Sequence, residues 1–278
     1  MPTGTLYVVA TPLGNLGDLT PRAAEILRGT PVVAAEDTRR TRGLLTHLGA
    51  SPRLLSFHQH SDPRRLELIL EILADGRDVA LVSDAGTPVV SDPGAELVAA
   101  VRERGGAVVP IPGVSAVATA LSVCGFGGDR YLFLGFVPRK GAERTRLIGR
   151  AIAEEWPVVF FEAANRLVAL LTDLVAAAGA ARRAFVGREL TKLHEELRPG
   201  TLGELAGYFS SREPRGEITV VLDGTGEAAA PPDRSEEAPA LVKQWLAGGM
   251  SRRDVVERLV AELGLPRNDA YRRVMEMQ

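Results

Sequence analysis

Short apolar runs alternate with helical patterns from Leu6 to about Leu222. Between Leu66 and Leu73, for example, apolar residues recur at the i, i+3, i+4, i+7 spacing of a helix that packs on a sheet. Uninterrupted apolar strands with helices between them are typical of parallel strands covered on both faces. The pattern therefore predicts two α/β domains with mainly parallel sheets. The predicted strands are Leu6–Ala10, Val32–Ala35, Arg53–Phe57, Val79–Val82, Ala107–Pro110, Tyr131–Leu134, Val158–Phe161, Phe185–Val186 and Ile218–Leu222.

Two breaks in this pattern divide the chain. Glycines cluster at residues 125–129, between a predicted helix and the next strand. This cluster predicts a boundary between an N-terminal α/β domain (1–125) and a C-terminal α/β domain (126–224). Residues 225–238 carry Gly, Ala, Pro and acidic residues without periodicity, so they are predicted to be a flexible linker.

The last segment, residues 239–278, is predicted to be a small helix-turn-helix-like tail. A helical stripe runs from Val256 to Leu263, and Gly264-Leu265-Pro266 is expected to end that helix. Asn268-Asp269 is expected to cap a following helix. A helix, a short glycine-containing turn and a second helix give the outline of a helix-turn-helix.

Composition and charge exclude several classes of protein. Apolar residues make up 45% of the chain and charged residues 24%, which is typical of a globular protein. The net charge of −2 excludes a globally basic nucleic-acid coat. Cys124 is the single cysteine, so no disulfide framework or thiolate zinc site is expected. The most apolar segment, Leu167 to Ala181, is interrupted by Asp173 and is too short to cross a bilayer. We therefore expect a cytoplasmic protein without a membrane segment or a signal peptide.

Four loops of similar composition follow predicted strands: Thr11–Asp18, Glu36–Arg40, Ser83–Pro88 and Pro110–Ala116. Ligands in an open α/β sheet bind beyond the carboxyl ends of the strands. The small residues in these loops let a ligand approach the backbone, and Asp84 can accept hydrogen bonds from ribose hydroxyls or an amine. We therefore expect the loops to line one crevice.

Other ligand classes lack their motifs here. The chain has no Gly-x-Gly-x-x-Gly dinucleotide fingerprint after the first strand and no P-loop. It also lacks a His/Cys cluster with metal-ligand spacing and a Gly-x-Ser-x-Gly nucleophile elbow. The crevice is predicted to bind a nucleoside-like ligand without a metal.

Five short motifs, in this order, resemble those of a known family: Thr11-Pro12-Leu13-Gly14-Asn15-Leu16, Ala35–Arg39, Ser83–Pro88, Pro112-Gly113 and Arg188-Glu189-Leu190-Thr191-Lys192. The family is the tetrapyrrole-methylase superfamily, and the resemblance is closer to its ribosomal branch of small-subunit rRNA 2′-O-ribose methyltransferases. The resemblance covers Leu6 to about Gly224, and the helical tail looks like the extra domain of that branch.

The resemblance implies a tetrapyrrole-methylase-like fold and a homodimer that binds S-adenosylmethionine between its two α/β domains. It also implies 2′-O-methylation of a cytidine in the decoding region of 16S rRNA. The methyl donor is expected to contact residues matched by motif, which are Pro12, Asp84, Ala85, Gly86, Thr87, Gly113, Ser115 and Ala116 in the first domain and Phe161 and Gly187 in the second.

One stretch departs from the family pattern. Similar proteins often have Phe-Tyr-Glu-Ser followed by His-Arg, whereas this chain has Phe160-Phe161-Glu162-Ala163-Ala164-Asn165-Arg166. The tyrosine and serine hydroxyls and the imidazole are missing, so a mechanism that needs them is not expected.

The candidate catalytic residues are Asp37, Glu162, Glu195 and Lys192. The sulfonium is a built-in leaving group, so transfer of its methyl group needs no metal. Orientation of the reacting atoms supplies much of the rate enhancement. A general base would come from one of the three carboxylates or from a neutral Lys192. The alternative is that Glu36 and Asp37 beside Arg39, and Glu195 near Lys192, form structural ion pairs. We expect Lys192 to orient the acceptor ribose or phosphate.

A local basic segment indicates RNA binding. Residues 130–150 contain six cations (Arg130, Arg139, Lys140, Arg144, Arg146 and Arg150) against Glu143, a net charge of +5. Phosphate contacts of such residues supply sequence-independent affinity for RNA, although a solvated helix face is the alternative. The residues expected to contact RNA are Arg39, Arg139, Lys140, Arg166 and Arg188.

The expected partner is 16S rRNA in the small ribosomal subunit, and no DNA partner is expected. The tail would help to dock the rRNA, or would serve as a helical dimer or packing element. Two other functions stay open. One is carbon methylation of a tetrapyrrole of the uroporphyrinogen type on the same fold. The other is a non-catalytic RNA- or nucleoside-binding module.

Overall fold

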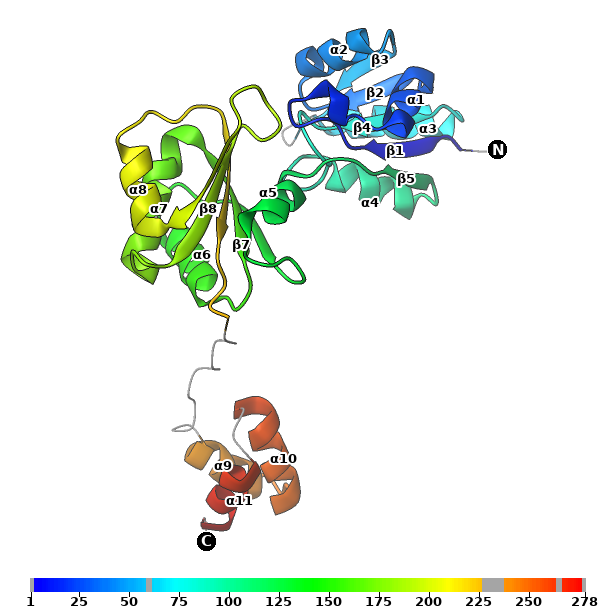
Figure 1. The fold of residues 1–278 in the computed structure, drawn as a ribbon. Helices are drawn as coiled ribbons and strands as arrows, with labels where there is room; N and C mark the ends of the chain where they lie inside the picture. The colour runs from blue at the N-terminus through cyan, green and yellow to red at the C-terminus, as the bar shows by residue number, and fades with distance from the viewer. Residues whose placement is uncertain (1–2, 59–61, 227–237, 264–266, 277–278) are drawn as a thin grey trace. The chain divides into compact units, whose positions relative to one another are not determined.

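A computed structural model describes residues 3–58, 62–226, 238–263 and 267–276 (Figure 1). Within these residues the chain forms two five-stranded sheets and a set of C-terminal helices. Residues up to Gly224 form one compact unit, and residues from Thr225 form a second. Each predicted strand is present, with ends shifted by a few residues at most, except that the predicted two-residue strand at Phe185 is the middle of a longer one.

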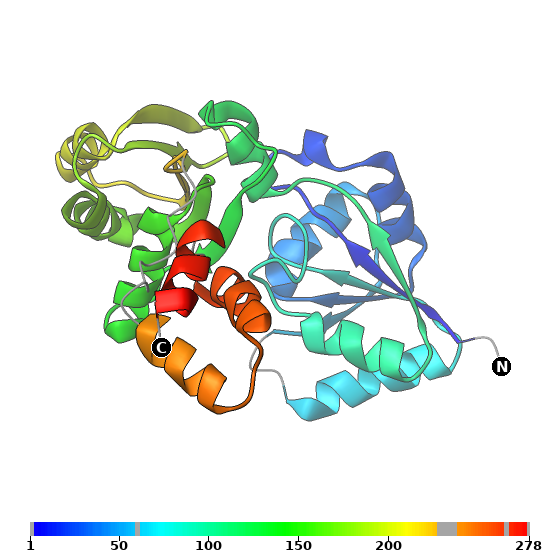
Figure 2. The ribbon, with the colours of Figure 1, turned by 90° about the horizontal axis from the view of Figure 1, so that it is seen from below.

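The first sheet is entirely parallel, as predicted, with the strand order β3-β2-β4-β1-β5. Helices α3 and α4 cover one face, and α1 and α2 cover the other (Figure 2). Both faces are therefore buried, which explains the uninterrupted apolar runs. The elements are β1 (Thr5–Val9), α1 (Pro21–Gly29), β2 (Val32–Ala35), α2 (Thr38–His47), β3 (Arg53–Ser56), α3 (Pro63–Ala74), β4 (Val79–Val82), α4 (Ala95–Glu103) and β5 (Ala107–Ile111).

The second sheet is mixed, in contrast to the mainly parallel sheet that the sequence predicted. Its order is β6-β7-β10-β8-β9, and β6–β7 is its only parallel pair of neighbouring strands. The elements are α5 (Ala116–Cys124), β6 (Leu132–Phe136), α6 (Ala142–Ala153), β7 (Val158–Ala163), α7 (Leu167–Ala178), β8 (Arg183–Arg188), β9 (Glu196–Thr201), α8 (Leu202–Ser210) and β10 (Glu217–Leu222). An apolar run shows that a strand is buried but does not show its direction.

Strand β9 was not predicted from the sequence. It is polar, contains Pro199, and lies at the edge of the sheet. Proline is tolerated in an edge strand because the side that lacks its N–H can face solvent, where no neighbouring strand needs a hydrogen bond. The short loop after Arg188 returns β9 beside β8, which makes this pair antiparallel.

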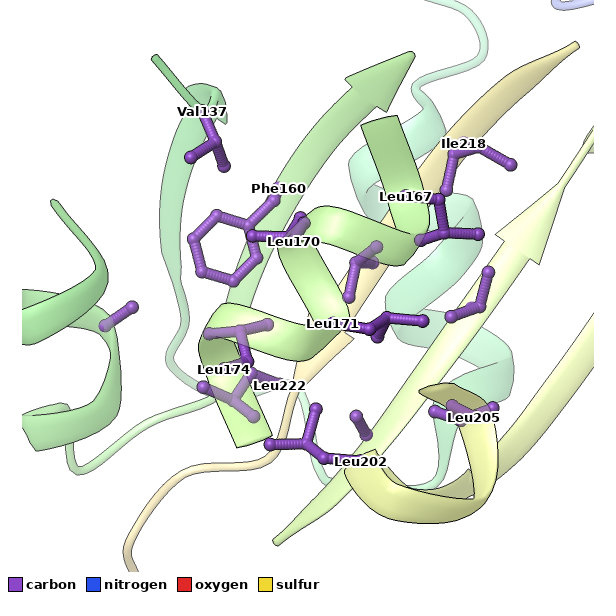
Figure 3. Close-up of a cluster of buried hydrophobic side chains, with 14 of the residues drawn as sticks. Val137, Phe160, Leu167, Leu170, Leu171, Leu174, Leu202, Leu205, Ile218 and Leu222 are labelled. Carbon is purple, nitrogen blue, oxygen red and sulfur yellow. The ribbon is translucent and has the colours of Figure 1, made fainter. Parts of the chain in front are cut away.

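The core of the second sheet lies under α6, α7 and α8. Leu167, Leu170, Leu171 and Leu174 of α7 are fully buried against Phe160 of β7 (Figure 3). Helix α5 covers the opposite face. The boundary at residue 125 stays a prediction, but α5, which precedes it, already packs on the second sheet.

The C-terminal unit has a core of its own. Helices α9 (Ala238–Ala247), α10 (Arg252–Leu263) and α11 (Arg267–Glu276) bury Val242, Val255, Leu259 and Val274 against one another. Helix α9 was not predicted. Asn268 and Asp269 lie inside the first turn of α11 and do not cap it, because the helix already begins at Arg267. Most of the predicted linker lies outside the described residues.

Candidate functional site

A cleft of about 440 Å³ opens beyond the carboxyl ends of the first sheet and is bordered on the other side by β6, β7 and β10. Residues of all four predicted loops line this cleft, as the sequence led us to expect. Its lining residues from the first sheet are Leu13, Glu36, Arg40, Asp84, Ala85, Gly86, Thr87, Val90, Ser91, Asp92, Ser115 and Ala116. From the second sheet they are Phe136, Phe161, Glu162, Ala163, Ala164, Gly216, Glu217, Ile218 and Thr219.

Hydrogen bonds hold three of these loops together. Thr11 and Gly86 exchange two bonds, each 2.9 Å long, and the Thr87 hydroxyl donates to the Val114 carbonyl at 3.1 Å. Gly86 has φ +81°, which a residue with a side chain adopts only with strain. A Cβ there would lie 3.3 Å from the Leu13 side chain, so glycine keeps the wall of the cleft thin.

The structure gathers most of the residues expected to bind the methyl donor. Asp84, Ala85, Gly86, Thr87, Ser115, Ala116 and Phe161 all border the 440 Å³ cleft. Pro12 instead borders a smaller neighbouring cleft of about 220 Å³, which shares Arg40 and Asp84 with the first. Gly113 and Gly187 border neither cleft.

Both of these glycines support neighbouring residues. A Cβ at Gly113 would lie 2.8 Å from the Cβ of Ala10, so glycine lets the chain before α5 pack directly on the end of β1. A Cβ at Gly187 would lie 2.9 Å from the Leu190 side chain. The two glycines shape the walls from behind.

Alternating charges cross the mouth of the cleft. Arg40 lies 3.5 Å from Asp84 and 3.8 Å from Glu217, and Lys192 Nζ lies 3.0 Å from Glu217 and 2.8 Å from Glu189. Asp84 Oδ1 also accepts the backbone N–H of Asp37 at 3.0 Å. These contacts connect loops of the first sheet to β10 and to the loop after β8.

Lys192 is held as a cation. Burial lowers its pKa, but hydrogen bonds to Glu189 and Glu217 outweigh burial, and the pKa of Lys192 is raised overall. Its aliphatic stem occupies the space beside Gly14, where a Cβ would lie 2.2 Å from Cγ. A neutral Lys192 acting as a base is therefore not consistent with this environment, whereas an orienting cation is.

Asp37 and Glu195 stabilise local backbone outside the cleft lining. Asp37 caps α2 by accepting the Arg39 N–H at 2.8 Å, and its bonds to the Arg39 side chain and backbone lower its pKa to about 2. Glu195 accepts the Thr191 N–H at 2.6 Å. Asp37 thus forms the ion pair with Arg39 that was stated as its structural alternative. Glu195 does not form the one stated with Lys192, because Lys192 pairs with Glu189 and Glu217 instead.

Glu162 lies in β7 at the border of the cleft, but its carboxylate does not face the cleft. Its side chain is fully buried and shares a face of β7 with Phe160, because side chains on one face of a strand alternate by two. Oε1 pairs with Arg166 at 3.1 Å, and Oε2 is buried without a hydrogen-bond partner among the described residues. Burial raises the pKa of Glu162, while the Ala163 N–H and Arg166 counteract it. The carboxylate faces the helix-covered side of the sheet, so it is not placed to take a proton from a ligand.

Two of the arginines expected to contact RNA are engaged inside the fold. Arg166 pairs with Glu162 and also donates to the Val137 carbonyl. Arg188 pairs with Glu196 at 2.9 Å and donates to the Arg215 carbonyl at 3.2 Å. Their guanidinium groups fix neighbouring strands.

The remaining expected RNA contacts are on the surface. Arg39 is 88% exposed although it pairs with Asp37. Arg139 and Lys140 are exposed and follow β6 within four residues of Phe136, which borders the cleft. The Phe136 ring is itself 56% exposed and lies edge-on to Phe161, with centroids 5.6 Å apart. An exposed aromatic ring thus borders the cleft, and two exposed cations follow it within four residues of the chain.

Three carboxylates of the cleft were not among the predicted site residues: Asp92, Glu217 and Glu36, the last considered only as part of an ion pair. A signal for Asp92 is present in the sequence, because Ser91-Asp92 repeats Ser83-Asp84 eight residues later. In the described part of the chain no three His, Cys, Asp or Glu side chains are arranged to hold a metal. None of its helices is long and apolar enough to span a bilayer.

Comparisons with known proteins agree on one family. The model of the Tetrapyrrole (Corrin/Porphyrin) Methylases matches residues 5–206. Two curated relatives carry the name ribosomal RNA small subunit methyltransferase I. One, from Synechocystis, is 42% identical over 99% of this chain and 99% of its own length. The other, from Escherichia coli O157:H7, is 39% identical over 99% and 96%.

Solved structures show the same fold at low sequence identity. A cobalt precorrin-4 methyltransferase of cobalamin biosynthesis has a TM-score of 0.62 at 16% identity, covering 79% of this chain and 94% of that one. The uroporphyrin-III C-methyltransferase of Thermus thermophilus, complexed with S-adenosylhomocysteine, has a TM-score of 0.58 at 20% identity, covering 79% and 97%.

Proposed function

The chain belongs to the tetrapyrrole methylase family and, along nearly its whole length, to the group of ribosomal RNA small subunit methyltransferase I proteins, and from this premise we propose that it methylates a cytidine ribose 2′-hydroxyl of 16S rRNA with S-adenosylmethionine. The observation that carries the proposal is the extent of this similarity. The relative from Synechocystis matches 275 residues, including the C-terminal helical unit, which the solved tetrapyrrole enzymes do not cover in full.

The cleft fits the proposed methyl donor. Its volume of about 440 Å³ lies in the usual range for small-molecule sites, roughly 300–1,000 Å³. Asp84 offers carboxylate oxygens to hydroxyl or amino groups, and Ala85, Gly86 and Ala116 let the ligand approach the backbone. Phe161 supplies an apolar wall. When bound, the donor supplies a sulfonium-activated methyl group.

Positioning carries much of the proposed reaction. The ribose oxygen attacks the methyl carbon while the carbon–sulfur bond breaks, and the electron pair of that bond stays on sulfur. Holding the three atoms in line is worth effective molarities on the order of 10⁵ M or more. The hydrogen bonds that join the Thr11, Gly86 and Val114 loops keep this wall of the cleft rigid.

The edge of the cleft favours RNA over a tetrapyrrole as the acceptor. Arg139 and Lys140 are exposed next to Phe136, and within the described residues neither is ion-paired. Such cations can contact phosphates, and an exposed aromatic ring can stack on an unpaired base. Arg39 provides a further exposed cation close to the Glu36–Arg40 loop.

Transfer of a labelled methyl group tests this function. The full-length protein and labelled S-adenosylmethionine are incubated with small ribosomal subunits, with free 16S rRNA and with uroporphyrinogen. Label is expected in RNA, at a cytidine whose 3′ phosphodiester resists alkaline hydrolysis because its 2′-oxygen is methylated. Labelled uroporphyrinogen would support the tetrapyrrole alternative, and donor binding without transfer to any acceptor would support a binding module.

Replacing Lys192 by methionine is expected to slow single-turnover methylation about tenfold. Methionine keeps most of the stem beside Gly14 but removes the cation that holds Glu217 and Glu189. Affinity for S-adenosylhomocysteine, measured by calorimetry, should change little. An unchanged single-turnover rate would eliminate the proposed orienting role of Lys192.

Removing residues 225–278 is expected to weaken methylation of small subunits while donor binding is retained. The C-terminal unit has its own core, and residues up to Gly224 form a separate compact unit that contains the whole cleft. The effect should appear as a rise in KM for subunits on the order of tenfold, since an accessory contact of about 1.4 kcal/mol is lost. Equal turnover by the shortened and full-length proteins would contradict a docking role for the tail.

We also propose a homodimer, as the family resemblance implies, acting in the cytoplasm where small subunits assemble. Sedimentation velocity measures the oligomeric state directly.

A further inference from the structure

Five carboxylates border the cleft, and their surroundings differ. Asp84 and Glu217 both approach Arg40, and Glu217 also pairs with Lys192. Glu162 turns its carboxylate to the other side of the sheet. Glu36 accepts the Asp84 N–H at 3.4 Å. Glu36 and Asp92 are both partly exposed, and neither is ion-paired with an arginine or lysine of the described residues. They differ in their neighbours, because burial raises the pKa of Glu36 but the charges of Arg40 and His58 lower it, whereas the charges that act on Asp92 are all negative.

The segment that carries Asp92 lies opposite the second sheet. A Cβ at Gly135 of β6 would lie 3.0 Å from the Ser91 hydroxyl oxygen. Val90, Ser91 and Asp92 therefore border the cleft close to Phe136, the residue that follows Gly135. Arg139 and Lys140 are exposed and follow Phe136 by three and four residues, so an RNA acceptor that contacted them and Phe136 would enter the cleft on the side of Asp92.

The backbone around Asp92 is held in an unusual conformation. Val89 has φ 75° and Ser91 has φ 65°, values that residues with side chains rarely adopt. Such strain costs on the order of 1–3 kcal/mol per residue and persists only where surrounding structure enforces it. The segment is therefore fixed, and Asp92 has a defined position at the cleft.

The surroundings of Asp92 raise its pKa toward neutral pH. Burial raises its pKa to about 6, with further contributions from the negative charges of Glu36, Asp84 and Glu217, while a hydrogen bond from Ser83 lowers it. A general base is most effective when its pKa lies near the working pH. Asp37, by contrast, has a pKa of about 2 and would accept a proton poorly.

We propose that Asp92 is the general base that receives the proton of the attacking ribose hydroxyl. This assignment rests on the function proposed above. As the oxygen bonds to the methyl carbon, its proton passes to a carboxylate oxygen of Asp92, and the carbon–sulfur bond breaks with its electrons retained by sulfur. The products are the methylated ribose, S-adenosylhomocysteine and protonated Asp92, which releases its proton to solvent.

The test is the pH profile of kcat/KM for small subunits, with the wild-type protein compared with Asp92→Asn. The wild-type profile should fall tenfold per pH unit below about 6, because the unprotonated carboxylate is the active form. Asp92→Asn should lower kcat/KM by about 10²- to 10⁴-fold and abolish this acid limb. Binding of S-adenosylhomocysteine should persist. Asp75→Asn, a matched change in a surface ion pair with Arg77, should behave as wild type.

Stability provides a readout independent of activity. The pKa of Asp92 in the folded protein, about 6, exceeds its unfolded value of about 3.9. Its contribution to stability is therefore complete below about pH 4 and is lost as pH rises through 6. Asp92→Asn should be more stable than wild type at pH 8 and no more stable at pH 4. The unfolding transition measured in this experiment also shows that the variant folds.

Three results would overturn the assignment. One is an Asp92→Asn enzyme within threefold of wild type that keeps the acid limb. Another is loss of that limb in Glu36→Gln instead. The third uses Ser83→Ala, which removes the hydrogen bond that lowers the pKa of Asp92, so an acid limb that fails to move to higher pH contradicts the role. Absence of transfer by wild type at every pH would instead refute the proposed function itself.

Discussion

Replacing Asp84 by asparagine should weaken binding of S-adenosylhomocysteine on the order of 30- to 100-fold. Asp84 borders both clefts, and a hydrogen bond to a charged group contributes about 1.5–3 kcal/mol. Asparagine retains an oxygen that can accept the Asp37 N–H, so the loop keeps its internal bond. The change therefore removes the charge that we expect to bind the ligand, together with the 3.5 Å ion pair to the exposed Arg40, and it keeps the bond to the Asp37 backbone. Isothermal titration calorimetry measures the loss.

Asp75→Asn is the matched control for this experiment. Asp75 lies at the surface, where it pairs with Arg77 at 3.1 Å, and it borders neither cleft. The control should bind S-adenosylhomocysteine as wild type does. If Asp84→Asn also bound with wild-type affinity, Asp84 would not be the anionic partner of the donor, and the placement of the donor in this cleft would need revision.

Replacing Arg166 by methionine should destabilise the first unit by about 3 kcal/mol. Removing this guanidinium leaves the fully buried Glu162 carboxylate without its ion pair, and the Val137 carbonyl without a donor. Among the described residues Glu162 Oε2 has no partner, and the Ala163 N–H that Oε1 accepts at 2.9 Å offsets the loss only in part. Native-state hydrogen exchange of the β7 amides measures this stability without interference from the C-terminal helices.

The sign of its pH dependence distinguishes this role from RNA binding. Burial raises the pKa of Glu162 in the folded protein, so its stabilising contribution is present at low pH and is lost as pH rises through the folded pKa. The penalty of Arg166→Met should therefore be largest at alkaline pH and shrink on acidification. The double variant Glu162→Gln, Arg166→Met should recover much of the stability. A fully stable Arg166→Met protein with weakened rRNA binding would instead assign Arg166 to the RNA contact.

The sequence pattern predicted the first sheet well because helices cover both of its faces, and β2 and β4 are buried along their whole length. Apolar runs such as Val79–Val82 leave no other interpretation in a chain of this composition. The second sheet was predicted less completely. Its strands carry similar apolar runs, but the partner of each strand depends on loops and on long-range packing. The edge strand β9 escaped prediction because its partly exposed positions carry polar residues and a proline.

The candidate site, too, could be predicted from the sequence only in part. The composition of the loops at the strand ends was enough to predict a crevice at the first sheet, because the carboxyl ends of parallel strands lie at one edge. Seven of the ten residues expected to bind the donor border that cleft. Gly113 and Gly187 have the motif positions but support the walls, a difference that spacing along the chain does not reveal.

By itself, then, the sequence determined the strands other than β9, the four loops and the family. The tertiary structure alone decided which charged side chains reach the cleft. Glu162 follows Phe161 directly, yet alternation along β7 turns its carboxylate to the opposite face, where Arg166 neutralises it. Asp92 reaches the cleft because its strained segment lies against Gly135, far away along the chain. The physical reason is that charge, burial and proton affinity depend on neighbours in space, and those neighbours come from strands that only folding brings together.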